Sequence, residues 1–380
     1  MSRSEPIRSL QCPNCHGALL LTFDNWKVEK VGVRALVKDC PILRCPFCSF
    51  QLLPDVALAE IDRALDVAKK GGERLVNLRC PKSETRFRFS QDVEFSYDAR
   101  DYLYIPGLWR PSADGFLTPL FFNRGVILKY RNSSEYQLEL DSDTYGTVRM
   151  KNHTISFGLN RQEQVIMWLG DVDGLPVNER YYLLSENITS SHDVASEFYD
   201  GQIDVIWSEP SRERALFDAR AEFVQKGQRL LAAPVMLLDV ECSEILEGFR
   251  PPLAEDRRSV PNAIEDLCKV CVESINKAAF AAFLRNNGVA VDSKVGGLKV
   301  MEKWLELRVG KDARSFMSPL FVLYDLRINA AHLLSSERAS EVLESAKERL
   351  GGSTTDLIEI YRLLVTQVGN CFRELAAATG

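Results

Sequence analysis

Two short cysteine pairs near the N-terminus constrain this 380-residue chain more than any other feature of its sequence. Cys12 and Cys15 enclose Pro-Asn, and Cys45 and Cys48 enclose Pro-Phe, so both pairs have the form C-P-x-C. Two cysteines three residues apart in a tight turn can place both sulfur atoms on one Zn²⁺ ion at about 2.3 Å, and two such turns complete a tetrahedron. Four thiolates leave no open coordination position, so the spacing predicts a structural zinc site rather than a catalytic one.

The segment that contains these pairs resembles a zinc ribbon, over residues 1–55. Between the pairs, the apolar runs 19–21 and 31–37 are typical of strands that bring the two turns together. The resemblance implies structural Zn²⁺ as the cofactor and a role in docking nucleic acid or a protein partner. Cys40 and His16 stay open as substitute ligands, ranked below the four paired cysteines.

Cysteine use and charge limit the class of protein. Half of the ten cysteines lie in residues 1–50, and the N-terminus lacks the apolar stretch of a secretory signal, so we expect a cytoplasmic protein with reduced thiols. No run of about 18 apolar residues predicts a membrane span. The net charge of −6 excludes a globally basic nucleic-acid-binding protein. Residues 1–50 nevertheless carry seven Lys/Arg against four Asp/Glu, a local excess of +3.

The pattern of the remaining chain predicts a multidomain α+β protein. A connecting helix over 56–77, read from apolar residues at helical spacing within Pro54–Lys70, is followed by a β-rich domain over 78–210. A helical connector and linker over 211–254 precedes an all-α bundle over 255–380. The expected helices of the C-terminal part are 211–232, 260–285, 297–308, 318–334, 337–350 and 354–377.

Local signals add detail to this outline. The alternating segment Thr154–Phe157 and the apolar run Val165–Leu169 predict two strands joined by the polar loop 160–164. Ser353 and Asp356 match a capping box at the start of the last helix. Ser190–Asp193 reads as the N-cap of a helix near 191–200.

The segment from Arg327 to His332 is the second candidate site. It has the form R-x4-H, contains Asn329, and lies in a helix-rich region. This resembles the HEPN superfamily, over about residues 255–380. The resemblance implies an all-helical, HEPN-like bundle and, for many members, a metal-independent ribonuclease that works as a homodimer with the two motifs facing each other. Ile328 stands where the family usually has a polar residue.

The chemistry of these residue types suits cleavage of RNA. His332 can take the proton of the ribose 2′-OH near neutral pH, and Arg327 can stabilise the charge that develops on the phosphate. Asn329 can orient the substrate or the imidazole. Residues five apart differ by about 140° around an ideal helix, so Arg327 and His332 do not share a face, and a second subunit is one way to complete the site.

These readings give two function hypotheses. The first is an endoribonuclease of toxin or antiviral-defence type, acting on RNA and held inactive until the N-terminal half binds a protein or nucleic-acid trigger. The second is a non-catalytic binding protein, whose ribbon docks nucleic acid or protein and whose helical domain only dimerises. A hydrolase centred on His192 is a third hypothesis, ranked well below the other two. The polar residues of the middle domain that suggest a metal or acid–base cluster are His153, His192, Asp193, Glu197 and Asp200.

Overall fold

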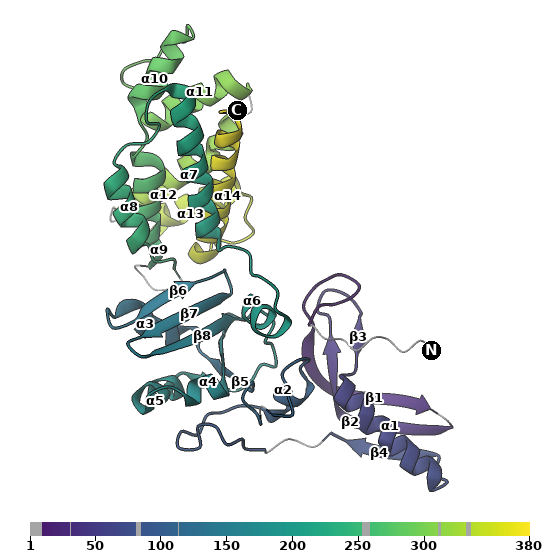
Figure 1. Ribbon diagram of the computed structural model, residues 1–380. Coiled ribbons are helices and arrows are strands. Elements are labelled where there is room, and N and C mark those ends of the chain that lie inside the picture. The colour runs from purple at the N-terminus through teal and green to yellow at the C-terminus, as the bar shows by residue number, and fades with distance from the viewer. Residues whose placement is uncertain are drawn as a thin grey trace. The chain divides into compact units, whose positions relative to one another are not determined.

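The structure is a computed structural model that describes residues 10–30, 32–80, 85–112, 114–252, 259–310, 313–331 and 336–380. The chain divides into two compact units, Met1–Glu209 and Pro210–Gly380. In the described residues, the first unit contains all the strands and the second is helical (Figure 1). The prediction of a multidomain α+β protein with N-terminal strands and a C-terminal helical region is therefore confirmed.

The N-terminal part of the first unit is a small sheet around a long hairpin. Strands β1 (Leu20–Lys30) and β2 (Val33–Arg44) pair antiparallel, and Gly32 at the turn between them has a φ of +79°, which glycine adopts without a steric penalty. β3 (Gln51–Leu52) pairs with β2 antiparallel, and β4 (Leu75–Arg79) pairs with β2 in parallel.

Helix α1 (Asp55–Lys70) connects β3 to β4 and confirms the helix expected at this position. Its sequence repeats apolar residues at helical spacing, and it ends at Gly71. Ile61 and Leu65 of α1 are buried against Val37 and other side chains of β2. The helix therefore covers one face of the small sheet.

A second sheet forms the middle of the chain. Its strands run in the spatial order β10-β5-β9-β8-β7-β6, and every pairing in it is antiparallel. β8 (His153–Leu159) and β9 (Val165–Trp168) are the two strands expected from sequence, joined by the loop 160–164. The remaining strands are β5 (Pro119–Phe122), β6 (Gln137–Leu140), β7 (Tyr145–Met150) and β10 (Asn187–Ile188).

Short helices surround this sheet, and one apolar core joins it to the small sheet. The helical segments are α2 (Ala99–Tyr104), η1 (Arg124–Val126), α3 (Ile127–Asn132), α4 (Leu169–Asp173), α5 (Val177–Ser185), α6 (Glu197–Tyr199) and the π-helical η2 (Asp200–Asp204). Buried residues of the N-terminal sheet, such as Leu21 and Leu43, share a cluster with Tyr104, Trp168 and Phe198. Burial of this apolar surface holds the two sheets together within the first unit.

The helix expected near 191–200 is shorter and starts later than predicted. α6 begins after Ser196, whose hydroxyl accepts a hydrogen bond from the N–H of Tyr199, and the chain continues as the π-helical η2. Ser190–Asp193 therefore do not cap a helix. His192 instead has a φ of +61°, a conformation that non-glycine residues adopt rarely.

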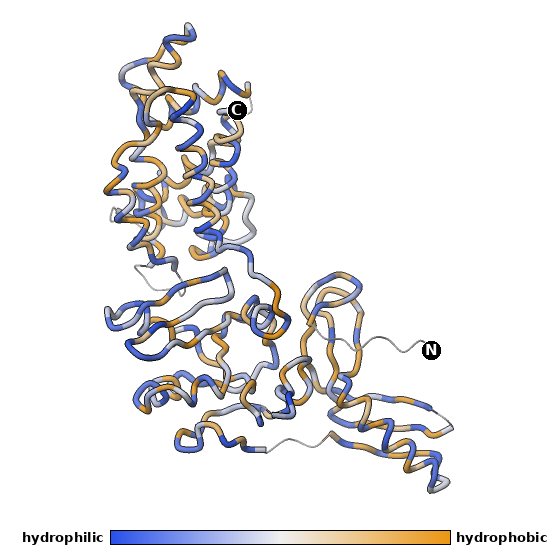
Figure 2. Tube along the Cα trace, in the orientation of Figure 1, coloured by the Kyte–Doolittle hydropathy of each residue, from blue (hydrophilic) through white to orange (hydrophobic). Residues whose placement is uncertain are grey.

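The second unit is a bundle of helices in its described residues. They are α7 (Arg212–Leu231), α8 (Asp239–Gly248), α9 (Ser259–Cys268), η3 (Lys269–Glu273), α10 (Lys277–Asn286), α11 (Gly297–Val309), α12 (Ala313–Ala331), α13 (Ser336–Leu350) and α14 (Leu357–Ala377). Hydrophobic and hydrophilic stretches alternate along these helices (Figure 2), which is the pattern of helices that bury one face. α14 packs closely along α7, where a Cβ added to Gly369 would meet the Cα of Leu216 at 3.4 Å.

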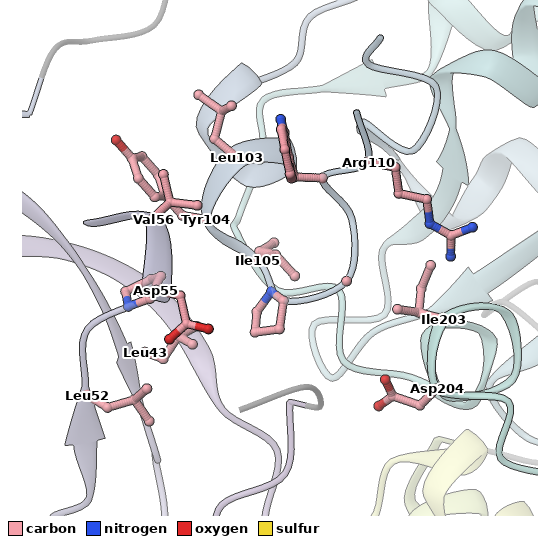
Figure 3. Close-up of a pocket in the computed structure, with 14 residues that line it drawn as sticks. Leu43, Leu52, Asp55, Val56, Leu103, Tyr104, Ile105, Arg110, Ile203 and Asp204 are labelled. Atoms are coloured by element: carbon pink, nitrogen blue, oxygen red, sulfur yellow. The ribbon is translucent and has the colours of Figure 1, made fainter. Parts of the chain in front are cut away.

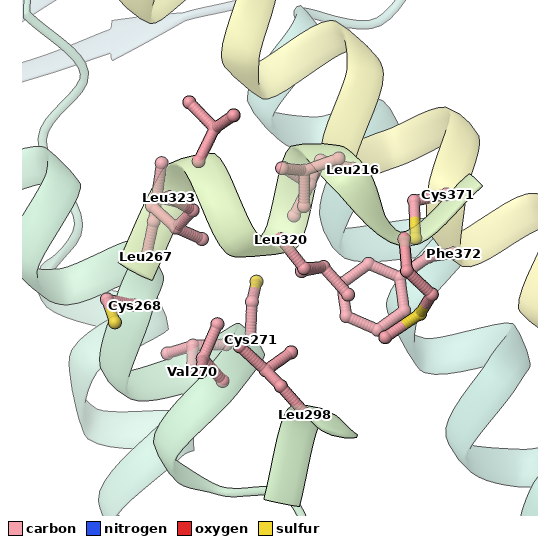
Figure 4. Packing of buried hydrophobic residues seen from close by; sticks show 14 of the residues in the cluster. Leu216, Leu267, Cys268, Val270, Cys271, Leu298, Leu320, Leu323, Cys371 and Phe372 are labelled. Atoms are coloured by element: carbon pink, nitrogen blue, oxygen red, sulfur yellow. The ribbon is translucent and has the colours of Figure 1, made fainter. Parts of the chain in front are cut away.

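A third CxxC pair of the sequence, Cys268 and Cys271, lies in the bundle core. Both cysteines are buried among Leu267, Leu320 and other apolar side chains (Figure 4). The single helix predicted over 260–285 is interrupted, because the chain passes from α9 into the π-helical η3 and then restarts as α10.

The capping box predicted at Ser353 is wrong. α14 starts at Leu357, and its N-cap is Asp356, whose carboxylate accepts a hydrogen bond from the N–H of Glu359 at 2.9 Å. Asp356 thus acts as the cap itself rather than as the third residue of the helix. The end of the helical connector and linker predicted over 211–254 lies outside the described residues.

Candidate functional site

Four cysteines from two turns of the first unit meet at one point. Cys12 and Cys15 lie in the turn before β1, and Cys45 and Cys48 lie in the turn between β2 and β3. Since β1 and β2 pair with Leu20 opposite Arg44, the hairpin brings the two turns to the same end of the sheet. The fold therefore gathers the four cysteines that the sequence singled out.

The spacing of the sulfur atoms fits one bound metal ion. The Sγ atom of Cys15 lies 3.4 Å from that of Cys45 and 3.8 Å from that of Cys48, and the Sγ atoms of Cys12 and Cys48 are 3.6 Å apart. All four lie within 4.8 Å of one another. A tetrahedron with metal–sulfur bonds of about 2.3 Å has sulfur atoms about 3.8 Å apart. A disulfide, at about 2.05 Å, is excluded for these pairs.

Backbone N–H groups support the charge that metal-binding thiolates carry. The N–H of Phe47 donates to Sγ of Cys45 at 3.4 Å. Burial raises the pKa of Cys45, but hydrogen bonds from this backbone and from neighbouring thiols outweigh it and lower the pKa to about 7. At Cys48 the backbone N–H of Phe50 lowers the pKa, but burial and the neighbouring thiols outweigh it and raise the pKa to about 12. The lowered pKa of Cys45 therefore favours the thiolate at this position, which is the form of cysteine that binds a metal cation.

The substitute ligands considered from the sequence do not join this group. Within the described part of the chain, the four cysteines are the one cluster of three or more His, Cys, Asp or Glu side chains close enough to hold a metal ion. Cys40 is instead buried in the core under α1, where burial raises its pKa to about 12. His16 lies in the turn after Cys15.

A histidine–aspartate pair in the middle of the first unit is the second arrangement of chemical interest. Nδ1 of His192 lies 2.7 Å from Oδ1 of Asp101, which is fully buried, and the Ser190 hydroxyl donates to Oδ2 of the same carboxylate at 2.6 Å. Burial lowers the pKa of His192, but the hydrogen bond and charge of Asp101 outweigh it, so the pKa is raised. Burial also raises the pKa of Asp101.

The other polar residues suspected in this region are used in separate contacts. Asp193 forms a bidentate ion pair with Arg161, with both N···O distances 3.1 Å. The Glu197 carboxylate accepts from the Thr144 hydroxyl at 2.9 Å. The metal cluster considered from the sequence is therefore not formed by these described residues, and His192 has a partner, Asp101, that its sequence neighbourhood did not reveal.

Arg327 and Asn329 lie on α12 of the second unit. Nη2 of Arg327 is 2.9 Å from Oε1 of Glu273, the last residue of the π-helical η3, and both side chains are about one-third exposed. The side-chain amide of Asn329 donates to the carbonyl oxygen of Asp325 at 2.7 Å. His332 lies outside the described residues.

Asp101 and Glu273 are the residues that the sequence reasoning missed. Both act through contacts between segments far apart in the chain, 91 residues in the case of Asp101 and His192. The one local signal is that Asp101 follows Asp98, which caps α2 by accepting from the N–H of Arg100. That signal predicts a helix start but not the buried pair.

Among the described residues, no helix is long and apolar enough to cross a membrane. Comparison with protein-family models, with curated proteins and with solved structures found no match.

Proposed function

We propose that the four clustered cysteines bind a structural Zn²⁺ ion and that the N-terminal unit is a zinc-ribbon module that binds single-stranded RNA. Support for the metal comes from the sulfur spacing, the all-thiol donor set and the backbone N–H donors. A bound Zn²⁺ ion would fix the conformation of both turns, and with it the positions of the side chains that lie between the two cysteines of each pair. A coordination shell filled by four thiolates leaves no position for substrate, so the ion would not take part in catalysis.

The exposed ring of Phe47 is the observation that carries the RNA-binding proposal. Phe47 lies between Cys45 and Cys48, and 69% of it is exposed. A Cβ added to Gly17 of the facing turn would meet the Phe47 ring at 2.5 Å, so the ring lies over that turn. An exposed aromatic ring on a rigid turn offers a surface on which an unpaired base stacks, worth about 1–3 kcal/mol per base.

Fluorescence anisotropy with a labelled single-stranded RNA tests this role on the zinc-loaded full-length protein. We expect Phe47→Ala to weaken binding at least tenfold. The matched control is Tyr181→Ala, which removes another exposed aromatic ring, on α5, and should leave binding unchanged. Binding that is absent in the wild-type protein, or equal in both variants, would reject RNA and leave protein docking as the role of the ribbon.

The second candidate function is cleavage of RNA by the helical unit. The favouring observation is the Arg327 guanidinium, which is partly exposed on α12 and is held by the carboxylate of Glu273. In this mechanism His332 takes the ribose 2′-OH proton, the freed oxygen attacks phosphorus, and the 5′-oxygen leaves with a proton. Arg327 stabilises the charge on the phosphate, Asn329 orients the reacting groups, and a homodimer completes the site.

Cleavage of a fluorescent RNA without added divalent metal tests the ribonuclease. We expect 2′,3′-cyclic phosphate ends with the wild-type protein and none with His332→Ala or Arg327→Ala. Equal cleavage by wild type and His332→Ala would assign the activity elsewhere. An absence of both cleavage and His332-dependent toxicity on expression would leave the helical unit without a catalytic role.

A further inference from the structure

The small sheet of the first unit has one face covered by α1 and a second face exposed to solvent. Val28 of β1, Val37 of β2 and Val76 of β4 pack in the apolar cluster under α1, which runs along the sheet (Figure 1). Successive side chains of a strand point to opposite faces of the sheet, so the neighbours of these valines lie on the other face. Those neighbours are mostly polar and exposed.

Four cations lie on this exposed face. They come from β1, β2 and β4, and all are exposed: Lys27, Arg34, Lys38 and Arg79. In the sheet, Lys38 pairs directly with Arg79, and Lys27 lies opposite Leu36, two residues before Lys38. Neighbouring strands lie about 4.8 Å apart, and alternate residues of one strand lie about 6.6 Å apart. The four side chains therefore form one patch, which we call the basic face.

Two of these four cations have no counter-charge. Nη2 of Arg34 lies 3.1 Å from Oε2 of Glu29, and Nε of Arg79 lies 2.9 Å from Oδ2 of Asp39. Neither Lys27 nor Lys38 forms an ion pair with any residue that the structure describes. With both carboxylates counted, the patch keeps a net charge of +2. The two arginine pairs are exposed and therefore weak, so a phosphate can replace either carboxylate.

The charge around a pocket of about 710 Å³ in the same unit is of the opposite sign. The carboxylates of Asp55 and Asp204 line this pocket together with a single guanidinium, that of Arg110 (Figure 3). A lining with more carboxylates than cations repels phosphate groups. The basic face is therefore better suited to a polyanion than this pocket.

The basic face and the exposed ring of Phe47 are connected by one strand. β2 carries Arg34 and Lys38 and ends at Arg44, directly before Cys45 of the turn that contains Phe47. Cys45 follows Lys38 by seven residues, which is about 20 Å of extended chain. An RNA strand of several nucleotides can span that length and contact both places.

We propose that the basic face binds the phosphate backbone of the single-stranded RNA whose base stacks on Phe47, with Lys27 and Lys38 as the main phosphate contacts. Lysine and arginine side chains that track the backbone, combined with an aromatic ring for a base, are how proteins bind single strands without sequence preference. The inference rests on the proposed RNA-binding function and adds the path of the RNA backbone to it.

The salt dependence of RNA binding tests the basic face. Fluorescence anisotropy with a labelled single-stranded RNA of about 20 nucleotides, longer than a single-strand site of one small domain, gives the affinity of the zinc-loaded full-length protein at several salt concentrations. Each lost phosphate contact lowers the slope of log K against log salt by about 0.7 for a single strand. Lys27→Gln/Lys38→Gln should therefore lower the slope by about 1.4 and weaken binding at least tenfold at low salt.

The matched control removes two lysines from the helix on the covered side of the sheet. Lys69→Gln/Lys70→Gln changes two exposed lysines in the last turn of α1, so the net charge of the protein changes by the same amount. It should leave the slope at the wild-type value. Zinc content and thermal melting of each variant establish that the fold is retained.

A slope that Lys27→Gln/Lys38→Gln leaves unchanged, or that both double variants lower equally, would overturn the basic face as the phosphate site. Phe47→Ala separates this inference from the function it rests on, because loss of stacking should weaken binding without changing the slope. If RNA binds through Phe47 and the slope does not depend on Lys27 and Lys38, the basic face alone fails. If the wild-type protein binds no RNA, the RNA-binding function fails with it.

Discussion

The two sites singled out by short motifs, the paired cysteines and the R-x4-H segment, are held in different ways. The C-P-x-C turns place their sulfur atoms locally, and the β1–β2 hairpin needs only to bring one turn beside the other. Arg327 stands on helix α12, and its guanidinium pairs with Glu273 from a separate segment of the bundle. A motif in a turn therefore carries most of its geometry within itself, whereas a motif on a helix takes its geometry from the fold around it.

Removal of one cysteine ligand should give the largest effect and separate the two sites most clearly. Cys45→Ser should lose the bound zinc and unfold the ribbon, because structural zinc contributes about 10–16 kcal/mol of apparent binding free energy in small zinc-binding peptides. Native mass spectrometry would measure zinc per chain, and circular dichroism would follow unfolding. The helical unit should keep its own melting transition.

The control for this experiment is a cysteine outside the cluster. Cys268→Ala removes a buried thiol of the bundle and should retain one zinc ion per chain. A full equivalent of zinc in Cys45→Ser would contradict the assignment of the four-cysteine site.

A substitution in the core of the bundle should destabilise the second unit and leave the zinc site unchanged. Phe372 of α14 is fully buried, and Phe372→Ala should cost the second unit about 3–5 kcal/mol of unfolding free energy, because it leaves a cavity. Zinc content should not change. Arg373→Ala, an exposed neighbour on the same helix, should cost less than about 0.5 kcal/mol in chemical denaturation. Equal losses for the two variants would mean that α14 does not pack as described.

The sequence predicted the features that are encoded locally. The cysteine pairs, the helix over Pro54–Lys70 and the β8–β9 hairpin each show their period or spacing within a few residues, and each is present in the structure. The fold class follows from the same signals, because runs of strands precede runs of helices.

The features that the sequence did not predict depend on long-range contacts. The pairing of Asp101 with His192 joins a helix to a loop across the first unit, and no spacing rule connects them. The π-helical interruption after Cys268 was missed because the residues on both sides have helical periodicity. The cap at Asp356 was misplaced by three residues because Ser353 satisfies the same local pattern.

The pair formed by the buried Asp101 and the partly exposed His192 predicts a smaller, pH-dependent effect on the first unit. Asp101→Ala should cost about 3 kcal/mol, because it leaves His192 and Ser190 without their acceptor. Both partners have raised pKa values in the fold, so the native state holds protons that the unfolded chain releases. The stability contributed by the extra proton of His192 is therefore complete below about pH 6.5, the ordinary pKa of histidine, and is lost as pH rises through the raised pKa of His192. The raised pKa of Asp101 makes the stability fall already above about pH 3.9, the ordinary pKa of an aspartate.

Urea unfolding at pH 5.5 and pH 8.5 would measure this contribution. The wild-type protein should lose more unfolding free energy between the two pH values than Asp101→Ala does. His153→Gln, a change of another histidine in the same unit, should keep the wild-type pH dependence. A pH dependence unchanged by Asp101→Ala would show that the pair does not hold the extra proton.

The smallest expected effect on stability comes from a substitution of Glu273. It tests whether the ion pair with Glu273 keeps Arg327 from binding a phosphate. Because the Arg327–Glu273 pair is partly exposed, Glu273→Ala should cost only about 0.2–1 kcal/mol in thermal or chemical unfolding. The same change removes the carboxylate that neutralises Arg327 and would leave the guanidinium available to a phosphate. If the bundle cleaves RNA, Glu273→Ala should therefore raise the cleavage rate while barely changing stability.

Glu265→Ala is the matched control, because Glu265 also forms a partly exposed ion pair in this region, with Lys269. It should leave cleavage at the wild-type level. The double variant Glu273→Ala/His332→Ala should abolish any gain, which would tie the released arginine to the histidine of the motif. A rate that rises equally in both glutamate variants would point to general loosening of the segment. A rate that falls in Glu273→Ala would make the carboxylate a positioning group for Arg327 rather than a restraint on it.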